Sequence, residues 1–266
     1  MHSRSAPTPA PGSPPVRVVL VRPSNPQNLG AVARAMKNFG LSRLAIVAPP
    51  SWTGLPRGGG PLTAREEVLL RARKTARRAS DLLDAAAVHG RLRDAVAGTT
   101  WACGTTSRVV EGRPHLGPRE LAREVSARAA RGPIAVVFGE ERRGLSDAEL
   151  ELCQAVASIP TDAVYDSMNL AQAVAVVAYE MRSFDMAGLA VPGPTAGQEP
   201  ARHATLEALW ERMAVLLAAA GYLNSQNPEH ILADWRRLLA RAEPTQREVE
   251  LLLAGARALE RKLKLS

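Results

Sequence analysis

The chain has 266 residues and a formal net charge of +8, with a sequence pI of about 10.3. The basic excess lies in its N-terminal half and suggests a polyanionic partner. No apolar run approaches the roughly 20 residues that span a bilayer. Residues 1–15 lack the apolar core of a secretory signal, and the two cysteines lack metal-ligand spacing. We therefore expect a soluble cytoplasmic protein without a membrane anchor, a metal site or a disulfide framework.

The first third of the chain predicts a βαβ unit behind a tail. Residues 1–15 are rich in Pro, Ser and Ala, which predicts disorder. The β-branched run VRVVLV at residues 16–21 predicts a buried strand. After the turn-forming RPSNPQN, an apolar stripe predicts a helix over residues 28–39, ended by Gly40. A second strand is expected at residues 44–47.

A Gly/Pro-rich segment and a basic helix follow. The triple glycine within residues 51–62 lacks both a preceding strand and a following GK[ST], so we interpret it as a flexible linker. Residues 63–79 predict a helix whose basic side chains are Arg71, Arg73, Lys74, Arg77 and Arg78. Such a run is usually a solvated face. Contact with a phosphate backbone is the sharper alternative.

Further strands are expected at residues 99–104, 134–138 and 155–159, with helices at 117–130 and from Ser146 onward. Alternating strands and helices imply a parallel α/β sheet, and ligands bind such sheets at the carboxyl ends of the strands. Polar segments follow three of these ends, at residues 105–108, 139–145 and 161–169. Without GxGxxG or a Walker loop, this pattern predicts only an α/β enzyme or a ligand-binding protein.

The stretch at residues 159–180 (IPTDAVYDSMNLAQAVAVVAYE) joins a polar loop to a helix that is apolar almost all round. Such a helix must be buried in a core or against a partner chain. The polar residues before it, among them Ser167 and Asn169, are either helix caps or the lining of a ligand site. Beyond a Gly/Pro-rich linker at residues 186–202, three amphipathic helices predict a small bundle over residues 203–266.

Four segments together resemble the successive motifs of a known family: SNPQNLGAVARAMKNFGL, GTTSR, VVFGEERRGLSDAEL and the stretch at residues 159–180. They are similar to those of the SPOUT (trefoil-knotted) RNA 2′-O-ribose methyltransferases of the TrmH-like superfamily. The chain looks closest to the TrmJ branch, whose members modify tRNA at nucleotide 32 in the anticodon loop. The resemblance runs from about residue 16 to residue 263 and includes the C-terminal module.

The resemblance implies a methyltransferase domain over residues 16–185, with a deep C-terminal trefoil knot around residues 155–185, and a homodimer. It also implies S-adenosyl-L-methionine as cofactor. By motif, the cofactor contacts would fall on Thr105, Thr106, Ser107, Gly139, Ile159, Asp166, Ser167 and Met168. Gly139 lacks a Cβ and would let its backbone approach the ligand. Backbone groups of Ile159 and Met168 could contact an adenine edge.

Arg34 matches the arginine of the first motif, the family's proposed activator of the ribose 2′-hydroxyl. A guanidinium keeps its proton near neutral pH, so it would orient the hydroxyl, stabilise the developing alkoxide or hold a phosphate. The resemblance makes Asn28, Glu141, Ser167 and Asn169 the supporting polar groups, although Glu141 could equally be a loop anchor. The reaction would be an in-line transfer that depends on positioning and desolvation.

The implied function is 2′-O-ribose methylation of tRNA, on cytidine or uridine. The same chemistry on rRNA is the near alternative, and a non-catalytic RNA-binding protein of the same fold is the second class. A generic nucleotide-binding protein is disfavoured by the missing phosphate loops.

Overall fold

The computed structural model describes residues 16–48, 52, 63–162, 164, 167–186, 199–223 and 228–264. The tail expected at residues 1–15 lies outside this part of the chain. So do most of the linkers expected at 51–62 and 186–202. Among the described residues, no helix combines the length and apolar character needed to cross a bilayer.

The described strands form one parallel sheet in the spatial order β3-β2-β1-β6-β4-β7-β5. The strands are β1 (Val16–Val21), β2 (Arg43–Val47), β3 (Ala87–His89), β4 (Trp101–Thr105), β5 (His115–Leu116), β6 (Ile134–Phe138) and β7 (Ala155–Ala157). The parallel α/β architecture is thus confirmed. The central strands are buried on both faces, which explains why they are continuous apolar runs.

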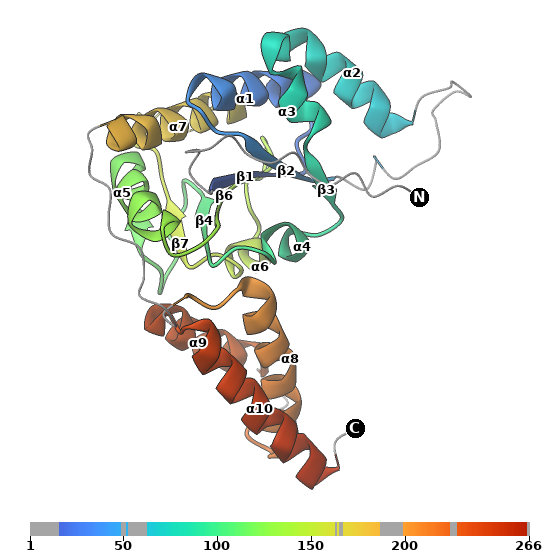
Figure 1. Ribbon diagram of the computed structural model, residues 1–266, viewed down its shortest axis with the longest axis vertical. Coiled ribbons are helices and arrows are strands. Elements are labelled where there is room, and N and C mark those ends of the chain that lie inside the picture. Colours follow the sequence, from blue (N-terminus) through green and yellow to red (C-terminus); the bar gives the residue numbers. More distant parts are fainter. Residues whose placement is uncertain are drawn as a thin grey trace.

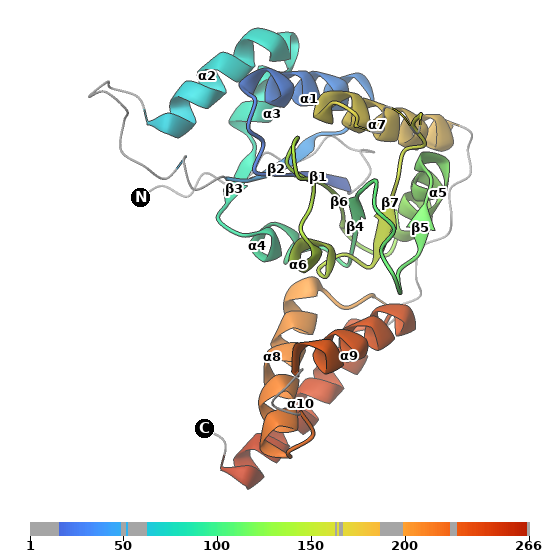
Figure 2. The same cartoon turned by 180° about the vertical axis from the view of Figure 1, so that it is seen from behind.

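Helices cover both faces of the sheet (Figure 1). One face carries α1 (Pro26–Asn38), α2 (Ala64–Ala76), the 3-10 turn η3 (Arg77–Ala79), α3 (Ser80–Asp84), α5 (Pro118–Ala129) and α7 (Leu170–Met186). The opposite face carries the shorter α4 (Leu92–Val96) and α6 (Asp147–Leu150), as the reverse view in Figure 2 also shows. Because strand side chains alternate, Val18 and Leu20 enter the first core while Val19 and Val21 enter the second.

Several predicted boundaries shift for local reasons. Helix α1 begins at Pro26 rather than residue 28, because Asn25 accepts a hydrogen bond from the Gln27 amide and proline suits the first helical turn. The single helix expected at residues 63–79 ends at Ala76, where Arg77 takes a positive φ of 54°. Strands β3 and β5 are absent from the sequence prediction.

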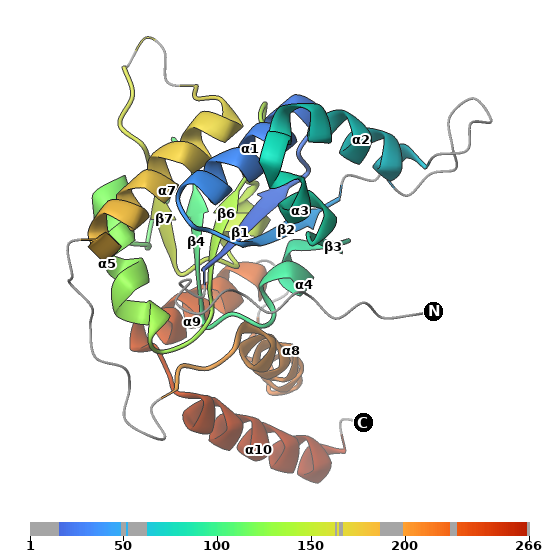
Figure 3. The same cartoon turned by 45° about the horizontal axis from the view of Figure 1, so that its top comes forward.

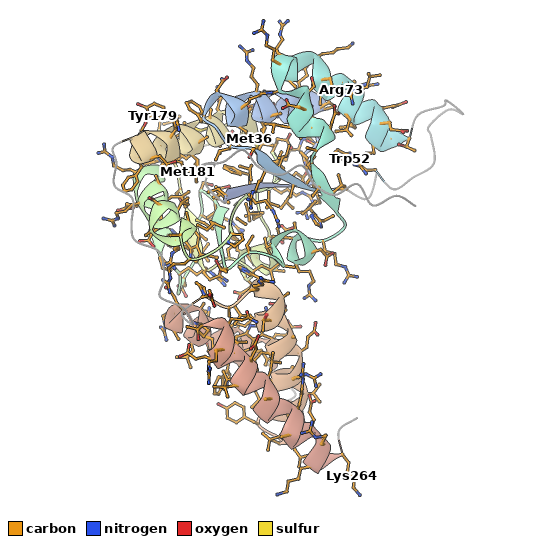
Figure 4. All side chains as sticks on the ribbon, viewed as in Figure 1. Met36, Trp52, Arg73, Tyr179, Met181 and Lys264 are labelled. Carbon is orange, nitrogen blue, oxygen red and sulfur yellow. The ribbon has the colours of Figure 1, made fainter. Side chains whose placement is uncertain are left out.

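Helix α7 is buried on one side only within the chain. Val174, Val177 and Met181 lie in the core, while Tyr179 is 54% exposed and packs edge-to-face on Phe39, the residue directly after α1, with 6.0 Å between ring centroids. Figure 4 shows Met181 and Tyr179 on opposite sides of the helix. The apolar sequence of α7 therefore exceeds what the single chain buries.

The predicted C-terminal helices are α8 (His203–Ala219), α9 (Pro228–Ala242) and α10 (Gln246–Leu263). Leu209 of α8 packs with Val249 and Leu253 of α10, and the partly buried Leu239 of α9 packs against them. They lie below α4 and α6, apart from α1 and α2 (Figures 1 and 3). At the seam with the sheet, the buried His203 ring has Nδ1 2.8 Å from the Thr99 carbonyl oxygen and Nε2 3.2 Å from that of Leu152.

Candidate active site at the carboxyl edge of the sheet

The predicted cofactor residues converge because their strands are parallel neighbours. Thr105 ends β4, Gly139 follows β6, and Ile159 lies just beyond β7. Strand β4 pairs with both β6 and β7, so these three chain ends leave the sheet side by side at its carboxyl edge. This is the edge at which open α/β sheets bind ligands.

A carboxylate joins two of the predicted motifs. Glu141 Oε2 accepts hydrogen bonds from the Ser24 amide (3.0 Å) and hydroxyl (2.9 Å), and Oε1 accepts from the Asn25 amide (3.2 Å) and Asn28 Nδ2 (3.1 Å). Burial by itself raises the pKa of Glu141, but its hydrogen bonds together outweigh that effect and lower the pKa below its ordinary value. Glu141 therefore anchors the start of α1 to the loop after β6.

The fourth motif, the stretch at residues 159–180, joins the same network through an asparagine. Asn169 Nδ2 donates to Asn28 Oδ1 at 2.9 Å, while Asn169 Oδ1 accepts from the Ala171 amide at 2.9 Å. Asn169 is thus a cap of α7 and at the same time a partner of α1. Three of the predicted supporting residues, Asn28, Glu141 and Asn169, form one hydrogen-bonded chain across segments more than a hundred residues apart.

Arg34 is not part of that chain. It lies on α1, six residues after Asn28, which places it about 240° further around the helix. Its side chain is exposed, and it forms no ion pair with a described carboxylate. Within one copy of the protein, Arg34 and the Asn28–Glu141–Asn169 network therefore face different directions.

The threonine segment after β4 is held by its neighbours. Thr105 Oγ1 donates to the Val137 carbonyl at 3.1 Å, and the Thr106 amide donates to the Ala157 carbonyl at 3.0 Å. The Ser158 hydroxyl donates to the Thr106 carbonyl at 2.6 Å. These bonds fix the backbone at the ends of β4, β6 and β7 relative to one another. Ser107 is exposed beyond them.

Gly139 has a structural role that differs from the expected one. A Cβ at this position would lie 2.2 Å from the Gly144 carbonyl carbon and 2.4 Å from the Leu145 amide nitrogen. The loop folds back on itself there, with the Gly144 amide donating to the Glu140 carbonyl at 2.8 Å. The missing Cβ makes room for the loop's own backbone, so the glycine by itself is not evidence for a ligand.

The remaining predicted residues lie directly before α7. Ser167 is exposed and Met168 is half-buried, both next to the network residue Asn169. Asp166 lies outside the described residues.

Two arginines that lie at this edge of the sheet were not identified from the sequence. Arg22, which follows β1 with a φ of 49°, forms an ion pair with Glu149, and the Arg22 Nη2–Glu149 Oε2 distance is 3.0 Å. Arg108 donates to the Leu145 carbonyl at 2.8 Å and pairs with Asp147 at 3.1 Å. The Ser146–Glu149 capping pattern was visible in the sequence, but nothing local to it indicated that Arg22 would reach the same carboxylate.

A cavity of about 370 Å³ lies elsewhere, where the amino ends of β4 and β7 face the C-terminal helices. Its walls include Trp101, Trp210 and Arg236. Because it is at the opposite end of the strands from the residues above, it contributes nothing to the carboxyl-edge site.

Comparison with known proteins identifies the family to which the chain belongs. The model of the SpoU rRNA Methylase family matches residues 15–179, which include all the motif residues at the carboxyl edge. The chain belongs to the SpoU methylase family.

Relatives of this SpoU methylase extend the match through the C-terminal helices. The tRNA (cytidine/uridine/adenosine-2′-O-)-methyltransferase TrmJ of Pseudomonas aeruginosa is 36% identical over 252 residues, which cover 89% of this chain and 90% of the relative. The tRNA (cytidine/uridine-2′-O-)-methyltransferase TrmJ of Salmonella typhimurium is 34% identical, covering 94% and 98%. The crystal structure of TrmJ from Z. mobilis superposes with a TM-score of 0.74 at 29% identity, covering 92% and 98%.

Proposed function

We propose that this SpoU methylase transfers a methyl group from S-adenosyl-L-methionine to a ribose 2′-hydroxyl of tRNA. The observation that carries the proposal is the similarity to tRNA 2′-O-methyltransferases over most of the chain, C-terminal helices included. The expected target is cytidine or uridine at nucleotide 32 in the anticodon loop. Methylation of rRNA, which the family's description names, is the alternative.

The cofactor would be held at the carboxyl edge. The chemistry of the groups at this edge fits a nucleoside that carries a sulfonium: the backbone around the half-buried Thr106, Gly139, Ile159 and Met168, and the hydroxyls of the exposed Ser107 and Ser167. When bound, the cofactor supplies the methyl group. Asp166 is assigned to this site from its motif alone.

The chain's own residues would position the acceptor. Asn28, Glu141 and Asn169 hold α1, the loop after β6 and the start of α7 in fixed relation, so the groups around the methyl donor are set before RNA arrives. Arg34 would contact the ribose or a flanking phosphate and stabilise charge that develops on the 2′-oxygen. Since Arg34 faces away from the network within one chain, its contact with the reacting ribose requires the assembled protein.

That assembly is proposed to be a homodimer in the cytoplasm, with α7 in the interface. Half-buried Ala171, Ala175 and Val176, together with the Phe39–Tyr179 pair, leave an apolar surface along α7 and α1. Light scattering of the purified protein would give twice the chain mass if this is correct.

Methyl transfer to unmodified tRNA transcripts, with the modified nucleotide mapped, tests the function. We expect methylation of a ribose in the anticodon loop that depends on S-adenosyl-L-methionine. In Arg34→Ala, kcat should fall by about 10²–10³-fold, as when a charge-stabilising donor is removed. Arg123→Ala, which removes an exposed arginine from α5, is the matched control and should keep full activity.

Two further measurements separate the alternatives: methyl transfer to rRNA fragments, and calorimetric titration with S-adenosyl-L-methionine. A protein that methylates rRNA fragments but no tRNA would shift the substrate assignment. A protein that binds tRNA yet takes up no cofactor, with or without RNA, would instead be a non-catalytic RNA-binding member of the fold.

A further inference from the structure

The end of α2 and the turn after it carry a concentrated positive charge. Its exposed basic side chains are Arg71, Arg73, Lys74, Arg77 and Arg78. Figure 4 labels Arg73 in this region, beside α3 and above α1. The acidic residues of α2, Glu66 and Glu67, lie in its first turn at the opposite end.

Most of this charge is not neutralised within the described chain. Arg73 pairs with Asp84, but Arg71, Lys74, Arg77 and Arg78 have no described carboxylate at ion-pair distance. Cations near a helix C-terminus favour the helix dipole, which accounts for part of this arrangement. That effect is confined to the last turn and does not require four unpaired cations.

Helix α5 provides the contrast. It also carries several arginines, but Glu120 and Glu124 are interleaved with them, and Arg128 pairs with both Glu124 and Glu243. A charge-balanced face of this kind is typical of a solvated helix. The last two turns of α2 lack such balance, so a polyanion is the partner that would complete them.

The segment that carries the unpaired cations is held in a fixed position against α1, the helix that carries Arg34. Gly30 of α1 lets the two helices approach closely, because a Cβ there would lie 2.0 Å from the Ala72 carbonyl oxygen. The Thr75 hydroxyl donates to the Gln27 carbonyl at 3.0 Å.

At the other end of the contact, Lys37 Nζ donates to the Arg78 carbonyl at 2.7 Å. Lys37 is three residues from Arg34, so the two lie on neighbouring turns of one helix face. The basic end of α2 is therefore continuous with the surface that carries Arg34.

We propose that the face formed by Arg71, Lys74, Arg77 and Arg78 binds the sugar-phosphate backbone of the RNA substrate on the side of Arg34. The inference rests on the proposed function, since it assigns the substrate's phosphates to a surface next to the proposed catalytic arginine. Phosphate contacts position an RNA without reading its sequence, which fits long, exposed side chains with no fixed partners.

The test is the double variant Arg71→Gln/Lys74→Gln, with Arg119→Gln/Arg123→Gln on α5 as the control that removes the same charge from exposed, unpaired positions. The dissociation constant for an unmodified tRNA transcript is measured from about 50 to 300 mM KCl. If both α2 residues contact phosphates, the salt slope should fall by about 1.5 in the α2 variant. At physiological salt, Kd and KM for tRNA should rise about tenfold. The control should match the wild type.

Three outcomes are informative. A lower salt slope in the α2 variant alone, with unchanged affinity for S-adenosyl-L-methionine, supports the inference. If both variants lose the same amount of tRNA affinity, the charge acts generally and the inference is overturned. If the α2 variant loses only thermal stability, the basic residues stabilise the helix and the inference is also overturned. If the wild type methylates no tRNA, the proposed function fails, and that result is distinct because tRNA binding is measured separately.

Discussion

At the scale of single residues, Glu141 links parts of the chain that are far apart in sequence. Its two oxygens accept four hydrogen bonds from Ser24, Asn25 and Asn28, and Asn28 passes the connection on to Asn169. All four donors need the ionised carboxylate, and a neutral amide at this position could accept at only one atom. The network is therefore sensitive to both the charge and the shape of this side chain.

Replacing Glu141 with Gln should lower the free energy of unfolding by about 1 kcal/mol at pH 7, a modest value because the carboxylate is only half-buried. A carboxylate whose pKa is lower in the native than in the unfolded state stabilises the fold above the unfolded value of about 4.3 and loses this contribution as pH falls. Denaturant unfolding at pH 7 and pH 3.5 measures the difference. Equal destabilisation at both pH values would show that the charge of Glu141 contributes nothing.

The residues that make this network could be identified from the sequence, but the network itself could not. Asn28, Glu141 and Asn169 were selected by their motifs. The hydrogen bonds among them span 113 and 141 residues, so no local pattern encodes them. Gly139 shows the reverse problem, since a glycine after a strand has several physical explanations and only the position of Gly144 distinguishes among them.

At the scale of elements, the packing of α1 on α2 depends on one missing side chain. Gly30 sits where the Ala72 carbonyl and the Thr75 hydroxyl approach α1, and both atoms would be within 2.2 Å of a Cβ. Neither can move freely, because Ala72 is helix backbone and Thr75 is bonded to Gln27. The helices must separate if any side chain is added.

Gly30→Ala should therefore destabilise the protein by about 1–3 kcal/mol, although alanine favours helices intrinsically. Gly255→Ala is the matched control, since a Cβ at that position of α10 meets nothing within 4 Å, and it should be neutral or slightly stabilising. Thermal unfolding of both variants measures the effect. A Gly30→Ala protein as stable as the wild type would contradict the close packing of α1 and α2.

The elements that the sequence predicted best are those buried on both faces. Strands β1 and β6 lie side by side in the middle of the sheet, and both were predicted with their observed bounds. Strands β3 and β5 occupy the two edges of the described sheet and are short, so they carry no apolar run to identify them.

At the scale of the whole molecule, the C-terminal helices are joined to the sheet through a buried histidine. Burial lowers the pKa of His203, and its hydrogen bonds to the Thr99 and Leu152 carbonyls and the charge of Glu207 only partly oppose that effect. Both ring nitrogens face carbonyl oxygens, which can only accept, so a neutral ring with its single N–H can donate to only one of the two.

This environment makes the stability of the protein depend on pH above the range in which carboxylates titrate. Below about pH 6.5 the unfolded chain takes up a proton at His203 that the native state resists. The free energy of unfolding should then fall by up to about 1.4 kcal/mol per pH unit between pH 6.5 and the lower native pKa. In His203→Gln this slope should be smaller.

Denaturant unfolding at several pH values between 5 and 8 measures the slope. His89→Gln is the comparison, because burial also lowers the pKa of His89, at a site away from the seam, so its removal should also reduce the slope. Identical slopes in the wild type and His203→Gln would show that His203 is not titrated between the two states.

The order of strands in the sheet also has a consequence for how the protein is made. Strand β4 lies between β6 and β7, and β5 pairs with β7 alone in the described sheet. Strands β4 and β5 therefore cannot pair until β6 and β7, which come later in the chain, have been synthesised. At about 5–20 residues per second, the ribosome needs several seconds to add the 49 residues between the end of β4 and the start of β7. During that interval the β1–β2–β3 half can form on the nascent chain, whereas the half that carries Thr105 and Ile159 cannot be completed. The proposed cofactor site is therefore completed late within the sheet, although the C-terminal helices are synthesised after it.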